Sequence, residues 1–439
     1  MLDAPAKEDT PLVAKKAAAK PLLSAIEGCR TLFTVGIIIY HYSGVRENYV
    51  RFHWQEYQNA GNATAPTEFE EWFSTAFLNG SAYAGVTVFF VIAGFLSQLS
   101  NALPPTGVRD RLKFICQRFL RLAPAYYFAI FLMAIFSVWN EDLRLMPSDY
   151  YTNLPMELLM IQRWVINDLS PAPDNCGRFY NGIAWFVSAL FGHICLQSLF
   201  GTWFSRATPG AWSALVGAIV CCAGRMAIWW LNSFDDTHPY TTDTRHWYYY
   251  WTIATFPAYL AGYCTARLVN HLEPDGPIRS WRGWAVVDSL SFVLFMLGYL
   301  VRLPGTEWQS IGGAHGPPEG LFASQIAVPL FCLLCFQCCC THQGIVLKIL
   351  GFPAFASLGP YSYAAYLLQI FWLKIALAIL SDPVHLAFPV FVLMTCWGSA
   401  AAVHHLIEKP LAPRLKTCVD ACFAPPPEGG GAHAPAPQP

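Results

Sequence analysis

About ten apolar segments, each roughly 20 residues long, recur along the chain. They lie near residues 26–45, 82–100, 120–139, 182–203, 211–231, 248–267, 284–302, 320–340, 359–380 and 388–406. A helix of this length crosses the hydrocarbon core of a bilayer, and a helix satisfies its own backbone hydrogen bonds there. The sequence therefore predicts an all-α integral membrane protein, built as a bundle of about ten transmembrane helices.

The composition agrees with a membrane protein. Charged residues make up 13% of the chain, about half the share found in soluble domains, and the net charge is −1. No basic patch is present, so we expect no nucleic-acid partner. Most of the 15 cysteines lie in apolar segments. We interpret these cysteines, including Cys332, Cys335 and Cys338, as small buried residues rather than metal ligands, because thiolates are costly in such surroundings.

The two ends of the chain differ in composition from the middle. Residues 1–20 are rich in Ala, Lys and Pro, and residues 416–439 finish in a Pro- and Gly-rich stretch. Both compositions are typical of disordered tails. We therefore expect a membrane domain over residues 21–415 between an N-terminal and a C-terminal tail.

Lysine and arginine gather in four places, each at the same side of the bundle if there are ten spans. These residues are Lys7, Lys15, Lys16, Lys20, Arg109, Arg111, Lys113, Arg118, Arg121, Arg267, Arg279, Arg282, Lys409, Arg414 and Lys416. Positive residues mark the cytoplasmic side. Both termini are therefore predicted to be cytoplasmic.

The alternate connections are longer and richer in acidic, Tyr and Trp residues. They cover residues 46–81, 140–181, 232–247 and 303–319. Two glycosylation sequons, at Asn62 and Asn79, fall in the first of them, on the predicted outer or lumenal side. We expect a multi-pass protein of the plasma membrane or of the endoplasmic reticulum and secretory membranes, with membrane lipid around it.

The first predicted span carries ionisable residues that are costly inside a bilayer. Arg30 and His41 are 11 residues apart, close to three helical turns, so both lie on one face. They are separated by roughly 16 Å along the helix axis. Glu27 and Thr34 lie near the same stripe, and the opposite stripe is Leu, Val and Ile. The span therefore has a polar line for its neighbours and an apolar line for lipid.

Several segments, taken in order, resemble one family. They are IEGCRTLFTVGIIIYHYSG (26–44), GVTVFFVIAGFL (85–96), RFLRLAPAYY (118–127), AWFVSALF (184–191), LGPYSYAAYLLQ (358–369) and HLIEKP (405–410). Together they are similar to the acyltransferase type 3 family, multi-span proteins that move acyl groups onto sugars, lipids and other acceptors. The resemblance covers most of residues 21–415.

The sequence departs from the family pattern at four positions. Ala93 stands where the family often has Ser, and Gln369 stands where His is common. Leu190 and Phe191 occupy positions where many sugar-modifying members have acidic residues. These departures bear on the acceptor and on activity.

The resemblance implies that His41 is a general base, which takes the proton of an acceptor hydroxyl as that hydroxyl attacks a thioester. The alternative for His41 is an interfacial residue in an aromatic belt with Tyr40 and Tyr42. Arg30 organises the polar contacts of His41 or meets the phosphates of a coenzyme A donor, and Glu27 is within reach of an ion pair with Arg30. The alternative for Glu27 and Arg30 is a structural salt bridge at the cytoplasmic edge.

Arg118 and Arg121 lie three apart at the cytoplasmic start of the third span, so they project from one face. Guanidinium groups suit phosphate recognition, and the resemblance implies that both arginines, with Tyr126, bind acyl-CoA. The alternative is that these arginines only satisfy the positive-inside rule.

Further residues are expected to line or support the pocket. They are Trp185, Ser188, Tyr363, Gln369 and Glu408, the last paired with Lys409 at the end of the final span. Small residues at Gly85, Ala93 and Gly94 either leave room for the pantetheine arm or let helices pack closely.

The predicted function is acyl transfer from cytosolic acyl-CoA, acetyl or longer, to a hydroxyl of a carbohydrate or lipid acceptor. Acyl-CoA is the donor substrate, and no metal takes part. A multi-span transporter or flippase is the main alternative, since a buried Arg and His also suit a substrate pathway. The sequence lacks the internal symmetry that many transporters show. A catalytically silent, lipid-binding member of the family is the other alternative.

Overall fold

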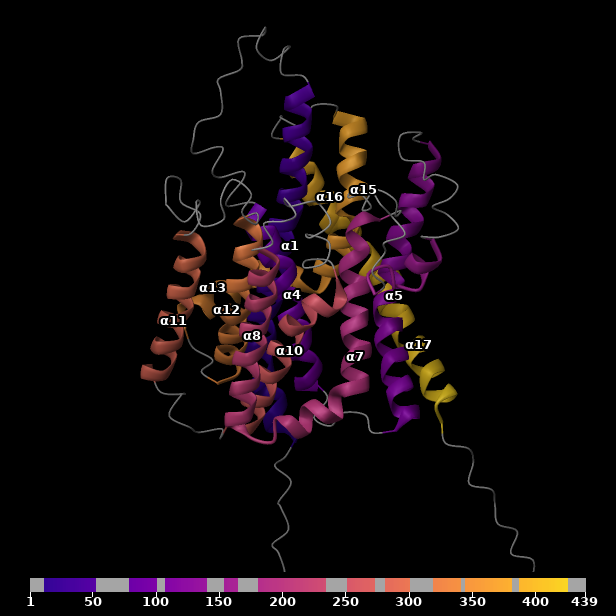
Figure 1. The fold of residues 1–439 in the computed structure, drawn as a ribbon. Coiled ribbons are helices and arrows are strands. Elements are labelled where there is room, and N and C mark those ends of the chain that lie inside the picture. Colours follow the sequence, from indigo (N-terminus) through magenta and orange to yellow (C-terminus); the bar gives the residue numbers. More distant parts are fainter. Residues whose placement is uncertain are drawn as a thin grey trace, which may run out of the picture.

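The computed structural model describes residues 12–52, 79–100, 107–139, 154–164, 181–233, 251–272, 281–300, 319–340, 344–380 and 387–424. Every regular element in these ranges is helical, and the long helices run roughly side by side in one bundle (Figure 1). The elements are α1 (Leu12–Phe52), α4 (Asn79–Ser100), α5 (Val108–Trp139), η4 (Gly182–Ala184), α7 (Trp185–Ala207), α8 (Ala211–Ser233), α10 (Thr252–His271), α11 (Trp281–Leu300), α12 (Glu319–Cys340), α13 (Ile345–Leu350), α14 (Pro353–Leu358), η9 (Gly359–Tyr361), α15 (Ser362–Leu380), α16 (Ala387–Val403), the π-helical turn η10 (His404–Glu408) and α17 (Lys409–Cys422).

Each apolar segment identified in the sequence overlaps a helix of the bundle. Within the described ranges, five helical stretches are long and apolar enough to cross a membrane: Val108–Phe136, Gly182–Ala207, Ala211–Ile228, Pro353–Leu380 and Ala387–Cys422. Shorter apolar helices cover Ala84–Leu99, Ala285–Leu294 and Ile326–Cys339. The all-α membrane class is thus confirmed, and the number of ten spans stays a prediction.

The helices reach further towards both ends of the chain than the sequence suggested. α1 begins at Leu12, inside the segment predicted to be a tail, where Ala and Lys favour helix. α17 runs to Cys422, past residue 416, because its last turns are bound to α5. The beginning of α1 and the end of α17 lie at the same end of the bundle (Figure 1). The sequon at Asn62 and most of the predicted outer connections lie outside the described residues.

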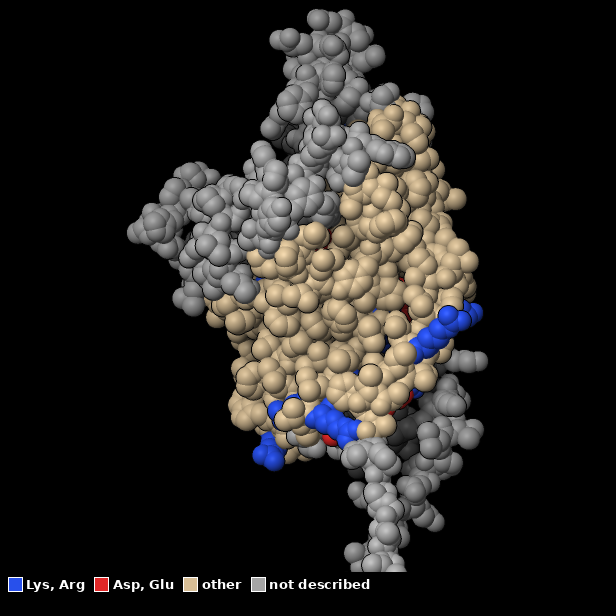
Figure 2. Space-filling model, turned by 90° about the vertical axis from the view of Figure 1, so that its right-hand side faces the viewer, with Lys and Arg blue, Asp and Glu red and all other residues tan. Residues whose placement is uncertain are grey.

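Much of the described surface is apolar. Large apolar side chains stand exposed along several helices; Trp212 of α8 is 80% exposed and Met394 of α16 is 71% exposed. In Figure 2 most of the face that carries α5 and α17 is free of charge, and Lys and Arg lie in its lower part. Such a surface is stable against lipid tails, which agrees with an integral membrane protein.

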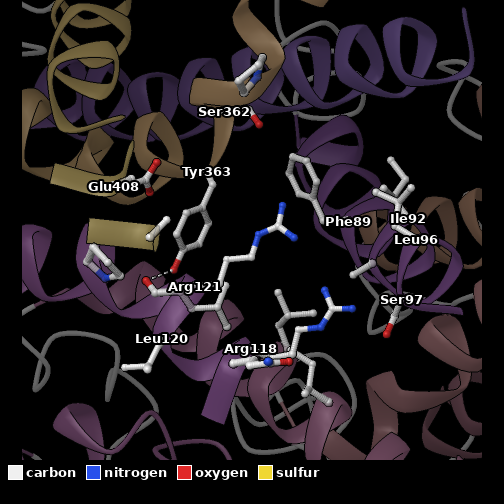
Figure 3. A pocket seen from close by; sticks show the side chains of 18 of the residues that line it. Phe89, Ile92, Leu96, Ser97, Arg118, Leu120, Arg121, Ser362, Tyr363 and Glu408 are labelled. Atoms are coloured by element: carbon white, nitrogen blue, oxygen red, sulfur yellow. Dashed lines mark hydrogen bonds between the residues drawn. The ribbon is translucent and has the colours of Figure 1, made fainter. Parts of the chain in front are cut away.

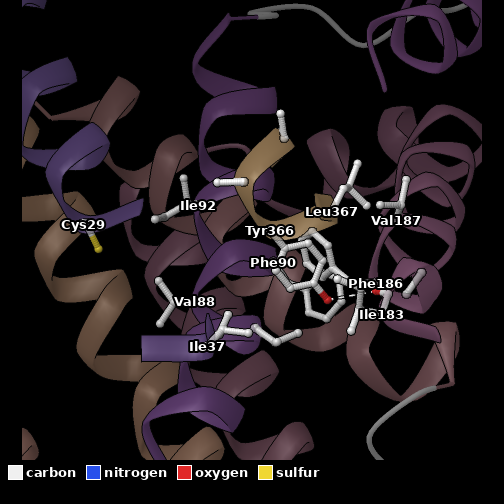
Figure 4. Packing of buried hydrophobic residues seen from close by; sticks show 14 of the residues in the cluster. Cys29, Ile37, Val88, Phe90, Ile92, Ile183, Phe186, Val187, Tyr366 and Leu367 are labelled. Atoms are coloured by element: carbon white, nitrogen blue, oxygen red, sulfur yellow. Dashed lines mark hydrogen bonds between the residues drawn. The ribbon is translucent and has the colours of Figure 1, made fainter. Parts of the chain in front are cut away.

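The core surrounds α4, which packs against α10, α12 and α1 and meets α7 through aromatic side chains. Phe90 and Phe186 have ring centroids 4.9 Å apart, and Phe186 and Tyr366 are 5.5 Å apart, so three helices meet in one aromatic cluster (Figure 4). Tyr366 also donates its hydroxyl to the Ile183 carbonyl at 3.0 Å. This cluster holds the first turns of α7 and α15 in place, and those turns line one side of the cavity described next.

Candidate active site

A cavity of about 790 Å³ lies between α1, α4, α5, α7, α15 and the η10–α17 segment. Its walls mix apolar side chains from α4 and α7 with charged side chains from α1, α5 and α17. They include Glu27, Arg30, Phe89, Ala93, Ser97, Arg118, Arg121, Phe186, Leu190, Tyr259, Ser362, Tyr363, Tyr366, His404, Glu408, Lys409 and Lys416. The volume is in the range of pockets that bind drug-sized organic ligands.

Arg118 and Arg121 carry the main positive charge of the α5 wall. Because they lie three residues apart on one helix, their side chains leave the same face, and Figure 3 shows both guanidinium groups pointing into the cavity. The guanidinium carbon of Arg118 lies 5.3 Å from the ring centre of Phe114, which orients that side chain. Two flat, permanently charged forks directed into one space form a suitable site for an oxyanion such as phosphate.

The charge of the cavity is positive as a whole. Five Lys and Arg side chains line it, against the two carboxylates Glu27 and Glu408, so the formal balance is three positive charges. Each carboxylate has a partner in the wall. Glu27 binds Arg30, and Glu408 Oε2 lies 2.9 Å from His404 Nδ1 within the π-helical turn. The cavity therefore favours an anionic ligand.

The Glu27–Arg30 pair stands at the edge of the cavity on α1. Arg30 Nη1 donates to both carboxylate oxygens of Glu27, at 3.1 and 3.2 Å, and the two side chains are about a quarter exposed. The Thr31 hydroxyl donates to the Phe355 carbonyl at 2.7 Å and fixes this part of α1 to α14. A Cβ on Gly28 would lie 1.7 Å from the Leu350 carbonyl oxygen, so only glycine permits this contact.

The α15 wall is tied to α5 by one hydrogen bond. The Tyr363 hydroxyl donates to the Leu122 carbonyl at 3.0 Å, drawn in Figure 3 beside Arg121 and Glu408. Tyr363 therefore helps to fix the distance between the first turn of α15 and the α5 arginines.

His41 lies away from the residues that line the cavity. It follows Arg30 by three turns, roughly 16 Å along α1, and it does not line the cavity. The imidazole is half-buried and packs edge-on against Tyr40, with ring centres 5.0 Å apart. The structure thus brings Glu27 and Arg30 together with the α5 arginines and leaves His41 three turns further along the same helix, outside the cavity lining.

Four other residues singled out in the sequence surround the cavity without lining it. The Tyr126 hydroxyl donates to the Glu157 carbonyl at 2.7 Å, and the Ser188 hydroxyl accepts from the Arg163 backbone N–H at 3.1 Å. Gln369 is fully buried, and its side-chain amide donates to the Tyr366 carbonyl at 3.0 Å. The Trp185 ring packs on Phe90, with ring centres 6.5 Å apart. Tyr126 and Ser188 therefore bind the segment 154–164, which the sequence did not predict to enter the bundle.

Sequence reasoning overlooked part of the cavity wall. His404 immediately precedes the quoted HLIEKP segment, and Lys416 lies seven residues after Lys409, two helical turns on the same face. That spacing is visible in the sequence, but it points to a cavity only when the helix that carries it is known to dock. A buried network also joins the inner wall, where the Ser97 hydroxyl donates to Gln197 Oε1 at 2.7 Å and the Tyr259 hydroxyl donates to the same oxygen.

One comparison with known proteins bears on this site. Residues 23–404 match a family model described as an acyltransferase domain. The match begins just before Glu27 and ends inside η10, so it covers most of the chain and stops before α17. No curated protein and no solved structure gave a match.

Proposed function

Because the chain belongs to the acyltransferase type 3 family over residues 23–404, we propose that this membrane acyltransferase uses acyl-CoA as donor and acylates a hydroxyl of a carbohydrate or lipid acceptor. The observation that carries the proposal is the placement of Arg118 and Arg121, whose guanidinium groups point into a positively charged cavity of about 790 Å³. Coenzyme A is rich in phosphate and cytosolic, and the end of the bundle that carries these arginines is the predicted cytoplasmic end.

The donor enters with its phosphates against the α5 arginines. Its pantetheine arm and acyl group then extend along the apolar wall of α4 and α7, past Ala93, Leu190 and Phe186. This wall offers space and apolar contact, which suits a flexible thioester arm better than a second charged group. Arg30, paired with Glu27, faces the same space from α1.

His41 supplies the base on the acceptor side. The acceptor hydroxyl gives its proton to the imidazole as its oxygen attacks the thioester carbonyl carbon. The C–S bond then breaks, the sulfur leaves as coenzyme A thiolate, and the proton passes from His41 to that thiolate. The separation of roughly 16 Å between Arg30 and His41 along α1 suits a donor whose phosphates stay near one surface while its thioester lies deeper.

The test is thiol release from acetyl-CoA and longer acyl-CoAs by the purified full chain in lipid nanodiscs. Radiolabelled donors are supplied with an extract of host sugars and lipids, so that label identifies the acceptor. We expect His41→Ala to abolish release while the protein stays folded. The matched control is His271→Ala, which removes an exposed imidazole at the end of α10.

Each outcome separates the candidates. Release that depends on His41, with label in one acceptor, supports the proposal. Release that persists in His41→Ala would contradict the assignment of the base. No release with any donor, from protein that is folded, would favour the transporter or the silent lipid-binding alternative.

A further inference from the structure

The last helix, α17, lies outside the family match and yet forms part of the cavity. The match ends at residue 404, and α17 begins at Lys409. Figure 1 shows α17 beside the lower half of α5. Its residues Lys409, Ala412, Leu415, Lys416 and Val419 line the same cavity as the α5 arginines. One wall of the proposed donor site therefore comes from a helix that lies beyond the matched residues.

α17 is fastened to α5 through its last turns. Lys113 Nζ lies 2.7 Å from Asp420 Oδ1, and Gln117 Nε2 donates to the same oxygen at 3.5 Å. Arg109 donates to the Ala424 carbonyl just beyond the helix. Val419, next to Asp420, is only 5% exposed. These contacts run along one side of α5 and set the position of α17 against it.

α17 adds two cations to the cavity that the α5 arginines line. Lys409 and Lys416 are seven residues apart, so both leave the helix on one face, and both line the cavity. Arg118 and Arg121 line it from α5. Cations on two separate helices enclose one space, and a ligand with several phosphates can bind both walls at once.

We propose that α17 is a phosphate-binding wall of the cavity, in which Lys409 and Lys416 bind donor phosphates together with Arg118 and Arg121 and Asp420 is the positioning residue that holds the helix in place. The inference rests on the proposed use of acyl-CoA and names the part of that donor which α17 recognises. Phosphate could also come from a lipid headgroup, so the experiment separates the two sources.

The experiment compares acetyl-CoA with acetyl-pantetheine, which carries the same thioester without phosphates, in nanodiscs of purely zwitterionic lipid. Lys416→Gln should raise the KM for acetyl-CoA about tenfold, since a charge-assisted hydrogen bond is lost, with kcat unchanged. Asp420→Asn should raise it up to about fivefold, as expected for a partly exposed ion pair. Neither change should alter turnover of acetyl-pantetheine.

Two further variants keep the test sharp. Exchanging the charges, Lys113→Asp with Asp420→Lys, should restore the KM that Asp420→Asn raises. Asp110→Asn removes a carboxylate from the exposed first turn of α5 and should leave the KM unchanged. Coenzyme A binding, measured by calorimetry on the same proteins, should follow the same order.

The outcomes are distinct. An unchanged KM in both Lys416→Gln and Asp420→Asn overturns the inference and leaves acyl-CoA as donor, and so does an equal effect on acetyl-pantetheine. An effect that appears only when anionic lipid is added assigns α17 to a lipid headgroup and overturns it as well. If the wild type neither binds coenzyme A nor turns over acetyl-CoA, the proposed function fails and the inference fails with it.

Discussion

Two faces of α4 differ in packing: one packs closely against α10, and another borders the cavity. On one face Gly94 lies against α10, where a Cβ would lie 1.9 Å from the Tyr259 carbonyl oxygen. On another face Phe89, Ala93 and Ser97 border the cavity. The first face is closed by leaving out a side chain, which lets two backbones meet. The second, open face borders a space into which the guanidinium groups of Arg118 and Arg121 point from α5.

At the closely packed face of α4, each of the two helices places a glycine against the backbone of the other. A Cβ on Gly262 of α10 would lie 2.0 Å from the Val91 carbonyl oxygen of α4, which mirrors the contact made by Gly94. Beside it, Gln197 of α7 accepts hydrogen bonds from Ser97 and Tyr259 and so joins a third helix to the pair. A rigid α4–α10 pair gives the cavity one fixed wall, against which α5 and α17 are placed.

The largest expected effect comes from breaking the closed face. Gly94→Ala should force α4 and α10 apart, because its methyl group overlaps backbone that no side-chain rotation can move. We expect a loss of about 3 kcal/mol or more in the free energy of unfolding, with a fall in the yield of folded protein. Thermal unfolding of the purified protein measures it.

The matched control for this change is Gly224→Ala in α8, where a Cβ would meet no atom within 4 Å among the described residues. It should be neutral or slightly stabilising, since alanine favours helix over glycine. Equal stability of the Gly94 and Gly224 variants would refute the close packing of α4 on α10.

The next largest effect concerns the open face. Replacing Arg118 or Arg121 with Gln should weaken coenzyme A binding by about tenfold to a hundredfold, because each loses charge-assisted hydrogen bonds to phosphate. Arg121→Lys should recover only part of the affinity, since an ammonium keeps the charge and loses the planar fork. Calorimetry with coenzyme A measures both, and thermal stability should stay near that of the wild type.

Arg206→Gln is the control for these arginine variants. Arg206 lies exposed in the last turn of α7 and does not line the cavity. It loses the same charge at the same end of the bundle, so it reports any general electrostatic effect. If Arg206→Gln weakened binding as much as Arg121→Gln, the arginines of α5 would act only through the overall field.

A smaller and more selective effect is expected at Ala93. Leucine there adds volume to the cavity side of α4 without touching the α10 side. It should lower turnover of longer acyl-CoAs by about tenfold and leave acetyl-CoA nearly unaffected, because the short acyl group needs less of the apolar wall. Ala402→Leu on the exposed face of α16 is the control. Equal losses with acetyl and longer donors would show that the acyl group does not pass Ala93.

The features that the sequence predicted well depend on local spacing. Apolar segments of about 20 residues identify the helices, since length and hydropathy are sufficient for that. Arg118 and Arg121 share a face because they lie three apart on one helix, and Glu27 reaches Arg30 for the same reason. Each of these relations holds before the helices pack.

The features that it missed depend on contacts between distant segments. Asp420 meets Lys113 only because α17 docks on α5, some 300 residues away in the sequence. The Tyr126 hydroxyl binds the Glu157 carbonyl only because residues 154–164 enter the bundle. Neither contact follows from periodicity, so the composition of the C-terminal segment did not indicate that α17 continues to Cys422.

The smallest expected effect separates two interpretations of the Glu27–Arg30 pair. Glu27→Gln keeps the size of a side chain that packs closely against Gly359, where an added Cβ would lie 2.4 Å from Glu27 Oε2. It removes one negative charge from the cavity. Stability should fall by only about 0.2–1 kcal/mol, as for other partly exposed ion pairs. If Arg30 meets the donor phosphates, the KM for acetyl-CoA should fall, because the guanidinium loses its competing carboxylate.

The direction of that KM change is decisive. Arg30→Gln should raise the KM for acetyl-CoA, and neither variant should change the KM for acetyl-pantetheine, which has no phosphate for Arg30 to bind. A KM that rises in both variants would mean that Glu27 is needed to hold Arg30 in its binding position. A KM unchanged in both would make the pair a purely structural link between α1 and its neighbours, so that the phosphates would contact only the cations of α5 and α17.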